Sequence, residues 1–207
     1  NKTPIKENCL LTGPMEETNL AYALAKISGL VLCKSYNYQY PKKTIFKSLM
    51  PTNLYGPNDN YHPIESHVIP SLIYKIHYAK INKKNIITLL GTGKAKRDFL
   101  FVDDLTKFAI NYLINSHKVK YKKIDYVNVG SGKEISIKKL ANIICKVVGY
   151  TGKIIFDKKS PDGHMSKLLD NTLSKNLGFS KTVDLNNGIK ISYLDFLRQI
   201  KNEKENK

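Results

Sequence analysis

The chain has 207 residues, enough for one domain with a real core but too few for two large domains. It carries 34 Lys and Arg against 17 Asp and Glu, a formal net charge of +17, yet only Arg97 and Arg198 are arginines. Arginine is better suited than lysine to bidentate hydrogen bonds with bases and phosphates, and no run of consecutive lysines is longer than two. The charge therefore favours an anionic small substrate over nucleic acid. No run of 18 apolar residues occurs, which argues against a membrane-spanning helix, and we expect a cytoplasmic protein.

The first half of the chain is predicted to alternate between helices and strands. Apolar residues at three- and four-residue steps predict a helix from Asn19 to about Tyr38. The elements expected next are a strand over Lys43–Met50 that stops at Pro51, a loop over Thr52–Glu65, a helix over His67–Lys80 with Pro70 in its first turn, and a strand over Ile86–Leu90 followed by a turn at Gly91–Gly93.

The second half continues the alternation. After Phe99–Val102, Asp103 and Asp104 are expected to start a helix that ends near Asn115. The later elements are a strand over Ile124–Val129, a helix from a Ser136 cap to Val148, a strand over Lys153–Asp157, a turn at Pro161–Gly163, and helices near Asn171–Leu177 and Leu185–Lys201.

This alternation predicts an α/β fold, and an open parallel sheet binds its ligand at the carboxyl ends of its strands. Two such ends are Pro51–Asn53 and Gly130–Gly132. No G-x-G-x-x-G follows any strand, so the glycine-rich cradle for a dinucleotide phosphate is absent from these 207 residues. The spacing of the His and Cys residues predicts no metal site and no disulfide framework.

Tyr22 and Lys26 are the first candidates for chemistry. At positions i and i+4 of a helix they share a face, where the ammonium lowers the pKa of the phenol. Such a tyrosine can give a proton to a carbonyl that receives hydride. The spacing is not specific by itself, because Tyr38 and Lys42 repeat it in a chain with 13 tyrosines and 34 Lys and Arg.

An ordered series of motifs gives the pair its context. Thr18–Gly29, which contains Tyr22 and Lys26, is followed by Met-Pro-Thr-Asn-Leu-Tyr-Gly-Pro at Met50–Pro57 and by Ser-His-Val-Ile-Pro at Ser66–Pro70. Arg-Asp-Phe-Leu-Phe-Val-Asp-Asp at Arg97–Asp104, Asn-Val-Gly-Ser-Gly at Asn128–Gly132 and Lys-Leu-Leu-Asp at Lys167–Asp170 complete the series. The series resembles the extended short-chain dehydrogenase/reductases that act on nucleotide sugars, and in particular the GDP-L-fucose synthases.

The resemblance implies the C-terminal part of a Rossmann-type NAD(P)-binding fold with a small α/β substrate-binding lobe. The implied reaction is the NADPH-dependent conversion of GDP-4-keto-6-deoxy-D-mannose to GDP-L-fucose, by epimerisation at C3 and C5 and then reduction at C4. Tyr22 is expected to protonate the C4 oxygen, and Lys26 to lower the tyrosine pKa and hold the nicotinamide ribose. His67 is expected to be the acid of the epimerisation, since imidazole titrates near neutrality, and also to lie against the cofactor.

The resemblance also assigns the binding residues. NADP(H) is expected against Pro51, Thr52, Asn53 and Leu54, besides Lys26 and His67. The GDP-sugar is expected at Lys75, Leu90, Arg97 and Asp162, where Arg97 suits a diphosphate because guanidinium is a bidentate donor to oxyanions. Leu90 stands where some family members have Trp, so one contact to the base or sugar differs.

The same resemblance predicts the domain boundaries and the assembly. Residues 1–54 and 97–130 are expected to belong to the dinucleotide-binding domain, 55–96 and 131–207 mainly to the substrate lobe, and the protein to form a homodimer that includes the Tyr22 helix. Members of the family have a longer N-terminal part, which carries the glycine-rich loop, the Ser that holds the keto oxygen and the Cys that acts as epimerisation base.

Three other readings remain open at this point. The chain could catalyse a different nucleotide-sugar reduction or epimerisation. It could be a truncated, non-catalytic homologue that binds GDP-sugars or pairs with a full-length subunit. A basic nucleic-acid binder is the last alternative.

Overall fold

The computed structural model describes residues 3–41, 46–118, 121 and 124–205. Its helices of five or more residues are α1 (Leu20–Gln39), α2 (Val68–Ile81), α3 (Val102–Ile114), α5 (Ile137–Val148), α6 (Thr172–Asn176) and α7 (Leu185–Glu205). Its strands are β1 (Ser48–Pro51), β2 (Asn53–Tyr55), β3 (Ile86–Leu90), β4 (Lys96–Phe101), β5 (Tyr126–Val129), β6 (Glu134–Ser136) and β7 (Lys153–Asp157). Two short 3-10 helices, η1 (Glu7–Cys9) and η2 (Glu17–Asn19), precede α1.

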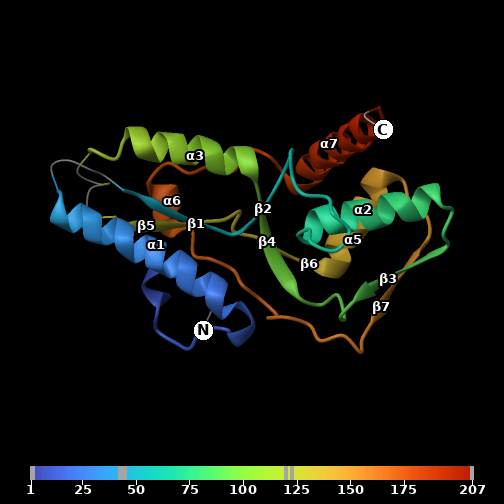
Figure 1. The fold of residues 1–207 in the computed structure, drawn as a ribbon, viewed down its shortest axis with the longest axis horizontal. Helices are drawn as coiled ribbons and strands as arrows, with labels where there is room; N and C mark the ends of the chain where they lie inside the picture. The colour runs from blue at the N-terminus through green and yellow to red at the C-terminus, as the bar shows by residue number, and fades with distance from the viewer. Residues whose placement is uncertain (1–2, 42–45, 119–120, 122–123, 206–207) are drawn as a thin grey trace.

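The strands form three small sheets (Figure 1). β1 pairs in parallel with β5, β2 in parallel with β4, and β3 in parallel with β7. β6 pairs antiparallel with β4. Figure 1 shows α1 and α3 flanking the β1–β5 pair at one end of the molecule, α2, α5 and α7 gathered at the other end, and β4 running between the two. The mixed α/β class predicted from the alternation is confirmed.

Each end of the molecule has its own hydrophobic core. The first core contains Leu100, Phe108, Tyr112, Tyr121, Val127, Val129, Leu177 and Phe179. Phe108 and Tyr112, one turn apart on α3, stack with ring centroids 5.7 Å apart. This core fixes α3 against the β1–β5 pair, whose carboxyl ends carry one half of the candidate site.

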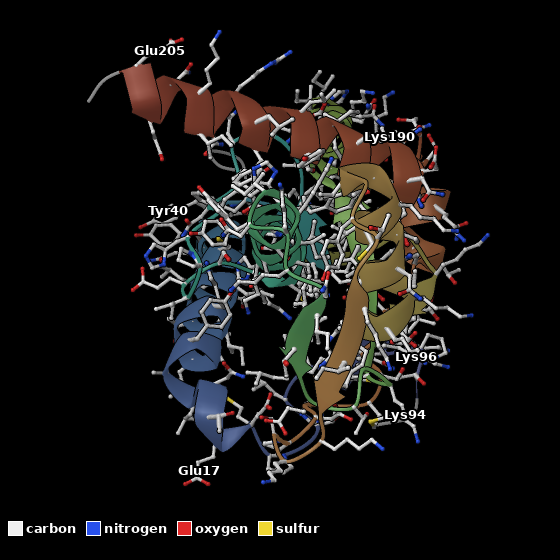
Figure 2. The ribbon with its side chains drawn as sticks, turned by 90° about the vertical axis from the view of Figure 1, so that its right-hand side faces the viewer. Glu17, Tyr40, Lys94, Lys96, Lys190 and Glu205 are labelled. Atoms are coloured by element: carbon white, nitrogen blue, oxygen red, sulfur yellow. The ribbon has the colours of Figure 1, made fainter. Side chains whose placement is uncertain are left out.

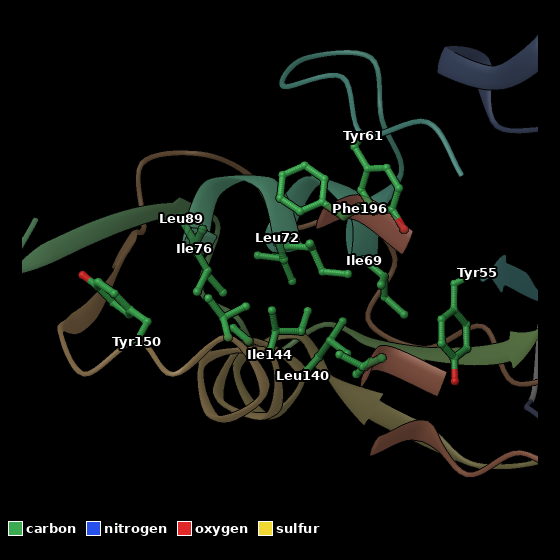
Figure 3. Packing of buried hydrophobic residues seen from close by; sticks show 14 of the residues in the cluster. Tyr55, Tyr61, Ile69, Leu72, Ile76, Leu89, Leu140, Ile144, Tyr150 and Phe196 are labelled. Carbon is green, nitrogen blue, oxygen red and sulfur yellow. The ribbon is translucent and has the colours of Figure 1, made fainter. Parts of the chain in front are cut away.

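The second core lies between α2, α5 and α7. Figure 3 shows Leu72 and Ile76 of α2 facing Leu140 and Ile144 of α5, with Phe196 of α7 beside Tyr61. Ser136 begins α5 as predicted, because its hydroxyl accepts the Lys139 N–H at 3.3 Å. Helix α5 ends at Gly149, whose φ of +74° is one that a side chain would strain.

Helix α1 confirms the predicted span, but none of its residues is buried. Figure 2 shows it along the margin of the molecule between the labelled Glu17 and Tyr40. Apolar side chains that the periodicity predicts for a core, such as Leu24 and Leu32, are exposed. In the described part of the chain no helix has both the length and the hydropathy needed to cross a membrane.

Several predicted boundaries are wrong. The strand expected over Lys43–Met50 occupies Ser48–Pro51, and residues 42–45 lie outside the described ranges. Pro51 ends the strand without breaking the pairing, because the next N–H, that of Thr52, donates to the Val129 carbonyl at 2.9 Å. Strand β2 falls inside the predicted Thr52–Glu65 loop, because its partner is the distant β4 and no local signal announces it.

Three smaller features differ from what the sequence analysis expects. β6 was not predicted, since a three-residue strand is visible only through its pairing with β4. Helix α3 begins at Val102 with Phe101 as its N-cap, so Asp103 and Asp104 occupy the first turn but do not cap it. The turn expected at Pro161–Gly163 lies earlier, at Lys158 and Lys159. The domain boundaries at residues 54, 96 and 130 stay a prediction.

Candidate functional site

The two strand ends singled out by the sequence lie side by side. In the parallel register of β1 and β5, Met50 is opposite Asn128 and Pro51 opposite Val129. The Thr52 N–H donates to the Val129 carbonyl at 2.9 Å, so the pairing continues past the end of β1. Pro51–Asn53 and Gly130–Gly132 therefore share one edge, the position where an open α/β sheet binds its ligands.

Asp98, on β4, joins these strand ends, although the sequence analysis assigns it no role. Its side chain is fully buried. The carboxylate accepts the Ser131 N–H and the Gly132 N–H, both at 3.2 Å, and also the Ser131 hydroxyl. The Asp98 main-chain carbonyl accepts hydrogen bonds from the Thr52 hydroxyl at 2.9 Å and from the side-chain amide of Asn53 at 2.8 Å. One residue thus holds the loops that follow both strands.

Burial raises the pKa of the Asp98 carboxyl, an effect opposed by the hydrogen bonds from Ser131 and Gly132. A Cβ at Gly130 would approach the carboxylate to 2.5 Å, so this position has no room for a side chain. The signal that could have identified Asp98 is an acidic residue inside the apolar strand that follows Arg97, because a buried acid needs several donors.

Tyr22 and Lys26 lie together on α1, as their spacing predicts. Tyr22 is 67% exposed, and the Lys26 Nζ lies 5.5 Å from the centre of its ring. Pro51, the last residue of β1, and Asn53, the first residue of β2, are exposed as well. A phenol and an ammonium that are both open to solvent can meet a ligand directly.

His67 is the N-cap residue of α2, with extended backbone angles and an exposed side chain. Burial raises the pKa of the nearby Asp59 carboxyl, an effect that the Asn60 N–H and the neighbouring His67 oppose. Among the described residues, the side chains of Tyr22, Lys26 and His67 share no hydrogen bond or ion pair. Tyr22 and Lys26 face the solvent from α1, and His67 faces it from the start of α2.

Arg97 and Asp162 are brought together. The Arg97 Nη1 donates to the His164 carbonyl at 2.5 Å, and its charge helps to lower the Asp162 pKa. The larger cause of that lowered pKa is the Thr92 side chain, whose hydroxyl donates to Asp162 while the Thr92 N–H donates at 2.9 Å. A cation on β4 and an anion on the segment after β7 form a polar surface next to the end of β3.

Leu90 and Lys75 complete the predicted set. Leu90 is the last residue of β3 and is 72% exposed, just before the Gly91–Gly93 turn that approaches Asp162. Lys75, exposed on α2, lines a pocket of about 430 Å³ together with Tyr74, Tyr78, Asn82 and Thr88 among others. That pocket contains neither Arg97 nor Asp162, so the structure groups three of the four substrate candidates and leaves Lys75 apart.

Within the described ranges no group of three or more His, Cys, Asp or Glu side chains could hold a metal ion. The three cysteines, Cys9, Cys33 and Cys145, are free thiols.

The sequence matches the model of the NAD dependent epimerase/dehydratase family over residues 1–130. It is 42% identical over 202 residues to putative GDP-L-fucose synthase 2 of Arabidopsis thaliana, covering 98% of this chain and 60% of that protein. It is 39% identical over 199 residues to GDP-L-colitose synthase of Yersinia pseudotuberculosis, covering 96% and 63%.

The fold matches the crystal structure of a GDP-L-fucose synthetase from Naegleria fowleri bound to NADP with a TM-score of 0.84. The two are 29% identical, and the match covers 97% of this chain and 60% of that one. The chain therefore spans about 60% of the length of the fucose synthases it matches.

Proposed function

Because the chain belongs to the NAD dependent epimerase/dehydratase family, we propose that the protein converts GDP-4-keto-6-deoxy-D-mannose to GDP-L-fucose with NADPH. The reaction consists of epimerisation at C3 and C5 followed by reduction at C4. One observation carries the proposal: the strand-end loop with Thr52 and Asn53 is hydrogen-bonded to the residue that follows Arg97. A coenzyme bound at Thr52 and Asn53 and a sugar diphosphate bound at Arg97 would then be neighbours.

The residues of this chain suit the nicotinamide half of NADP(H). In this proposal the exposed Tyr22 and Lys26, together with Pro51–Leu54, contact this half of the coenzyme, and His67 lies where it meets the substrate; the exposure of Tyr22, Lys26, Asn53 and His67 supports this role. The sequence has no glycine-rich cradle for the pyrophosphate, so that end of the coenzyme needs other residues. When bound, NADPH supplies the hydride.

In this proposal Tyr22 gives the proton to the C4 oxygen, and Lys26 holds the nicotinamide ribose. His67 returns protons to C3 and C5, whose hydrogens are acidic because they adjoin a carbonyl. Arg97 binds the diphosphate as a bidentate donor, with Asp162, Leu90 and Lys75 contacting the rest of the GDP-sugar. Its location on β4 next to the strand-end loops supports this role for Arg97.

We propose further that the protein acts as a homodimer. Support comes from α1, a helix of 20 residues without a buried side chain, which leaves Leu24, Val31 and Leu32 available to a second copy. A cytoplasmic location stays a prediction.

A different GDP-sugar reaction is the second candidate. It is favoured by the exposed Leu90, which cannot make the contacts of a Trp, and by the similarity to a colitose synthase. A non-catalytic, GDP-sugar-binding homologue is the third, supported by the lack of a phosphate cradle in these 207 residues.

The test is product analysis. The longest product of the gene is incubated with NADPH and GDP-4-keto-6-deoxymannose, and the sugar nucleotides are separated and identified by NMR. We expect GDP-L-fucose. A reduced sugar that is not epimerised at C3 and C5 would support the second candidate, and unchanged substrate with measurable binding would support the third.

A further inference from the structure

We propose that Asp98 is a positioning residue, which aligns the coenzyme-side loops at the ends of β1 and β5 with the substrate-side Arg97. This inference rests on the proposed function for its kinetic consequence. The alignment itself is a property of contacts made within the chain.

The contacts of Asp98 run in two directions. Its carboxylate holds the loop after β5 through three donors, the Ser131 N–H, the Ser131 hydroxyl and the Gly132 N–H. Its carbonyl holds the loop after β1 through the Thr52 hydroxyl and the Asn53 amide. The two loops also join each other, through the bond from the Thr52 N–H to the Val129 carbonyl.

The neighbouring residues on β4 connect this unit to the substrate side. Asp98 lies opposite Glu134 in the β4–β6 ladder, and Arg97 lies opposite Ile135. A shift of the Ser131–Gly132 loop therefore moves the start of β6 against the segment that carries Arg97. Phe99, the residue after Asp98, is opposite Asn53 in the β2–β4 ladder. Asn53, on the proposed coenzyme side, therefore pairs with the same segment of β4 that carries Arg97.

The chemistry requires a carboxylate at this position. Three donors converge on two oxygens that accept only, and the residue is shielded from water. An amide in the same place would turn its NH₂ group toward at least one N–H of the loop, leaving a buried donor unpaired. Asp98→Asn thus preserves the size of the side chain and the main-chain carbonyl that accepts from Thr52 and Asn53, but it removes the carboxylate that holds the Ser131–Gly132 loop in place.

Asp104 offers a matched control within the same chain. It is also buried, and its carboxylate accepts an equivalent trio: the Thr182 N–H and the Val183 N–H, both at 3.1 Å, and the Thr182 hydroxyl. These partners precede α7 and do not include the strand-end loops. A purely structural role for Asp98 predicts that Asp98→Asn and Asp104→Asn behave alike.

The experiment compares both variants in the longest product of the gene. Urea unfolding measures their stability, and steady-state kinetics of the folded enzymes give kcat and KM for NADPH and for the GDP-sugar. We expect both variants to unfold at a lower urea concentration than the wild type. Asp98→Asn alone should lose about tenfold to 10²-fold in kcat/KM for NADPH, the range for a reacting group misplaced by about 1 Å. Asp104→Asn should stay within about twofold of the wild type.

Hydrogen exchange gives a readout that does not depend on the reaction. In Asp98→Asn the amides of Thr52, Ser131 and Gly132 should exchange at least about tenfold faster, whereas Asp104→Asn should accelerate Thr182 and Val183 instead. If Asp98→Asn does not fold, Ser131→Ala, which removes the hydroxyl donor to Asp98 and also the acceptor of the Lys133 N–H, should show the same pattern with smaller changes.

The outcomes separate the two hypotheses. An inactive wild type overturns the proposed function. The positioning role of Asp98 is then tested by the hydrogen-exchange measurement alone. Equal kinetic losses in the two variants, or unchanged exchange at Thr52 in Asp98→Asn, overturns the positioning role even if the enzyme makes GDP-L-fucose.

Discussion

Tyr22 and His67 lie on different elements, and their proposed tasks can be separated by substitution. Tyr22→Phe removes the proton donor and should lower the rate of reduction by about 10²–10⁴-fold, while the C3 and C5 protons still exchange with solvent. His67→Gln removes the acid of the epimerisation, so deuterium uptake should fail first and the reducible isomer should not accumulate. Mass spectrometry in D₂O beside NADPH oxidation measures both.

The opposite division would contradict these assignments. Wild-type deuterium uptake in His67→Gln, or loss of uptake in Tyr22→Phe, would mean that the two side chains do not act on separate half-reactions. Tyr38→Phe is a suitable control, because Tyr38 lies on the same helix and is exposed.

The Asp162 carboxyl titrates in a way that reports on its loop. Its pKa lies below the ordinary value of 3.8, first because the Thr92 hydroxyl donates to it and then because of the Thr92 N–H. For an acid with a lowered folded-state pKa, the stabilisation is present above the unfolded value and is lost as the pH falls through the folded value. We expect the hydrogen bonds from Thr92 to the Asp162 carboxylate to stabilise the folded protein at neutral pH, and this stabilisation to be lost below about pH 4.

Thr92→Val tests this directly. An NMR titration of Asp162 should show its pKa moving part of the way back toward 3.8 in the variant, because the backbone N–H of residue 92 and then the charges of Lys94 and Arg97 still lower it. The stability difference between wild type and variant should shrink at low pH. A pKa unchanged by the substitution would assign the shift to another cause.

Helix α5 begins at a capping hydroxyl, and its loss has a foreseeable cost. Ser136→Ala leaves the Lys139 N–H without its acceptor and should destabilise the protein by about 1 kcal/mol. Ser136→Asp, which retains an acceptor at the helix N-terminus, should recover most of the loss. Urea denaturation of the three proteins measures the effect, and equal midpoints would show that the cap contributes nothing to stability.

The elements that the sequence predicted well carry their own signals. Helix α2 has a proline in its first turn, α5 has a cap and a terminal glycine, and β3 alternates buried and exposed residues. β2 and β6 could not be predicted in this way, because each is three residues long and exists through pairing with β4. Local periodicity has no access to a partner more than 30 residues away.

The candidate site follows the same division. The motif series led to Tyr22, His67 and Arg97, but their grouping depends on tertiary contacts. Asp98 appeared in the Arg97–Asp104 motif without a role, since its function is visible only when the loops after β1 and β5 reach it. Helix α1 shows the reverse error: its apolar periodicity predicts burial, whereas none of its side chains is buried.

These 207 residues contain no glycine-rich phosphate loop after a strand, and this has a measurable consequence. Residues 1–207, expressed by themselves, should bind NADPH weakly or not at all, because no helix N-terminus with a glycine turn is present for the pyrophosphate. Isothermal titration calorimetry measures this, with the longest product of the gene as the comparison. Micromolar binding by the 207 residues would mean that the coenzyme lies elsewhere.

Strand β4 borders both hydrophobic cores. Leu100, fully buried, belongs to the first core, while Phe99 and Phe101 on its other face belong to the second. The two ends of the molecule therefore cannot melt separately without exposing one face of the same strand, and unfolding should be cooperative. Leu100→Ala, expected to cost about 2–5 kcal/mol, should lower a single thermal transition rather than split it. In calorimetry, one peak with equal calorimetric and van't Hoff enthalpies would show that the two small cores, which share strand β4, unfold as one cooperative unit.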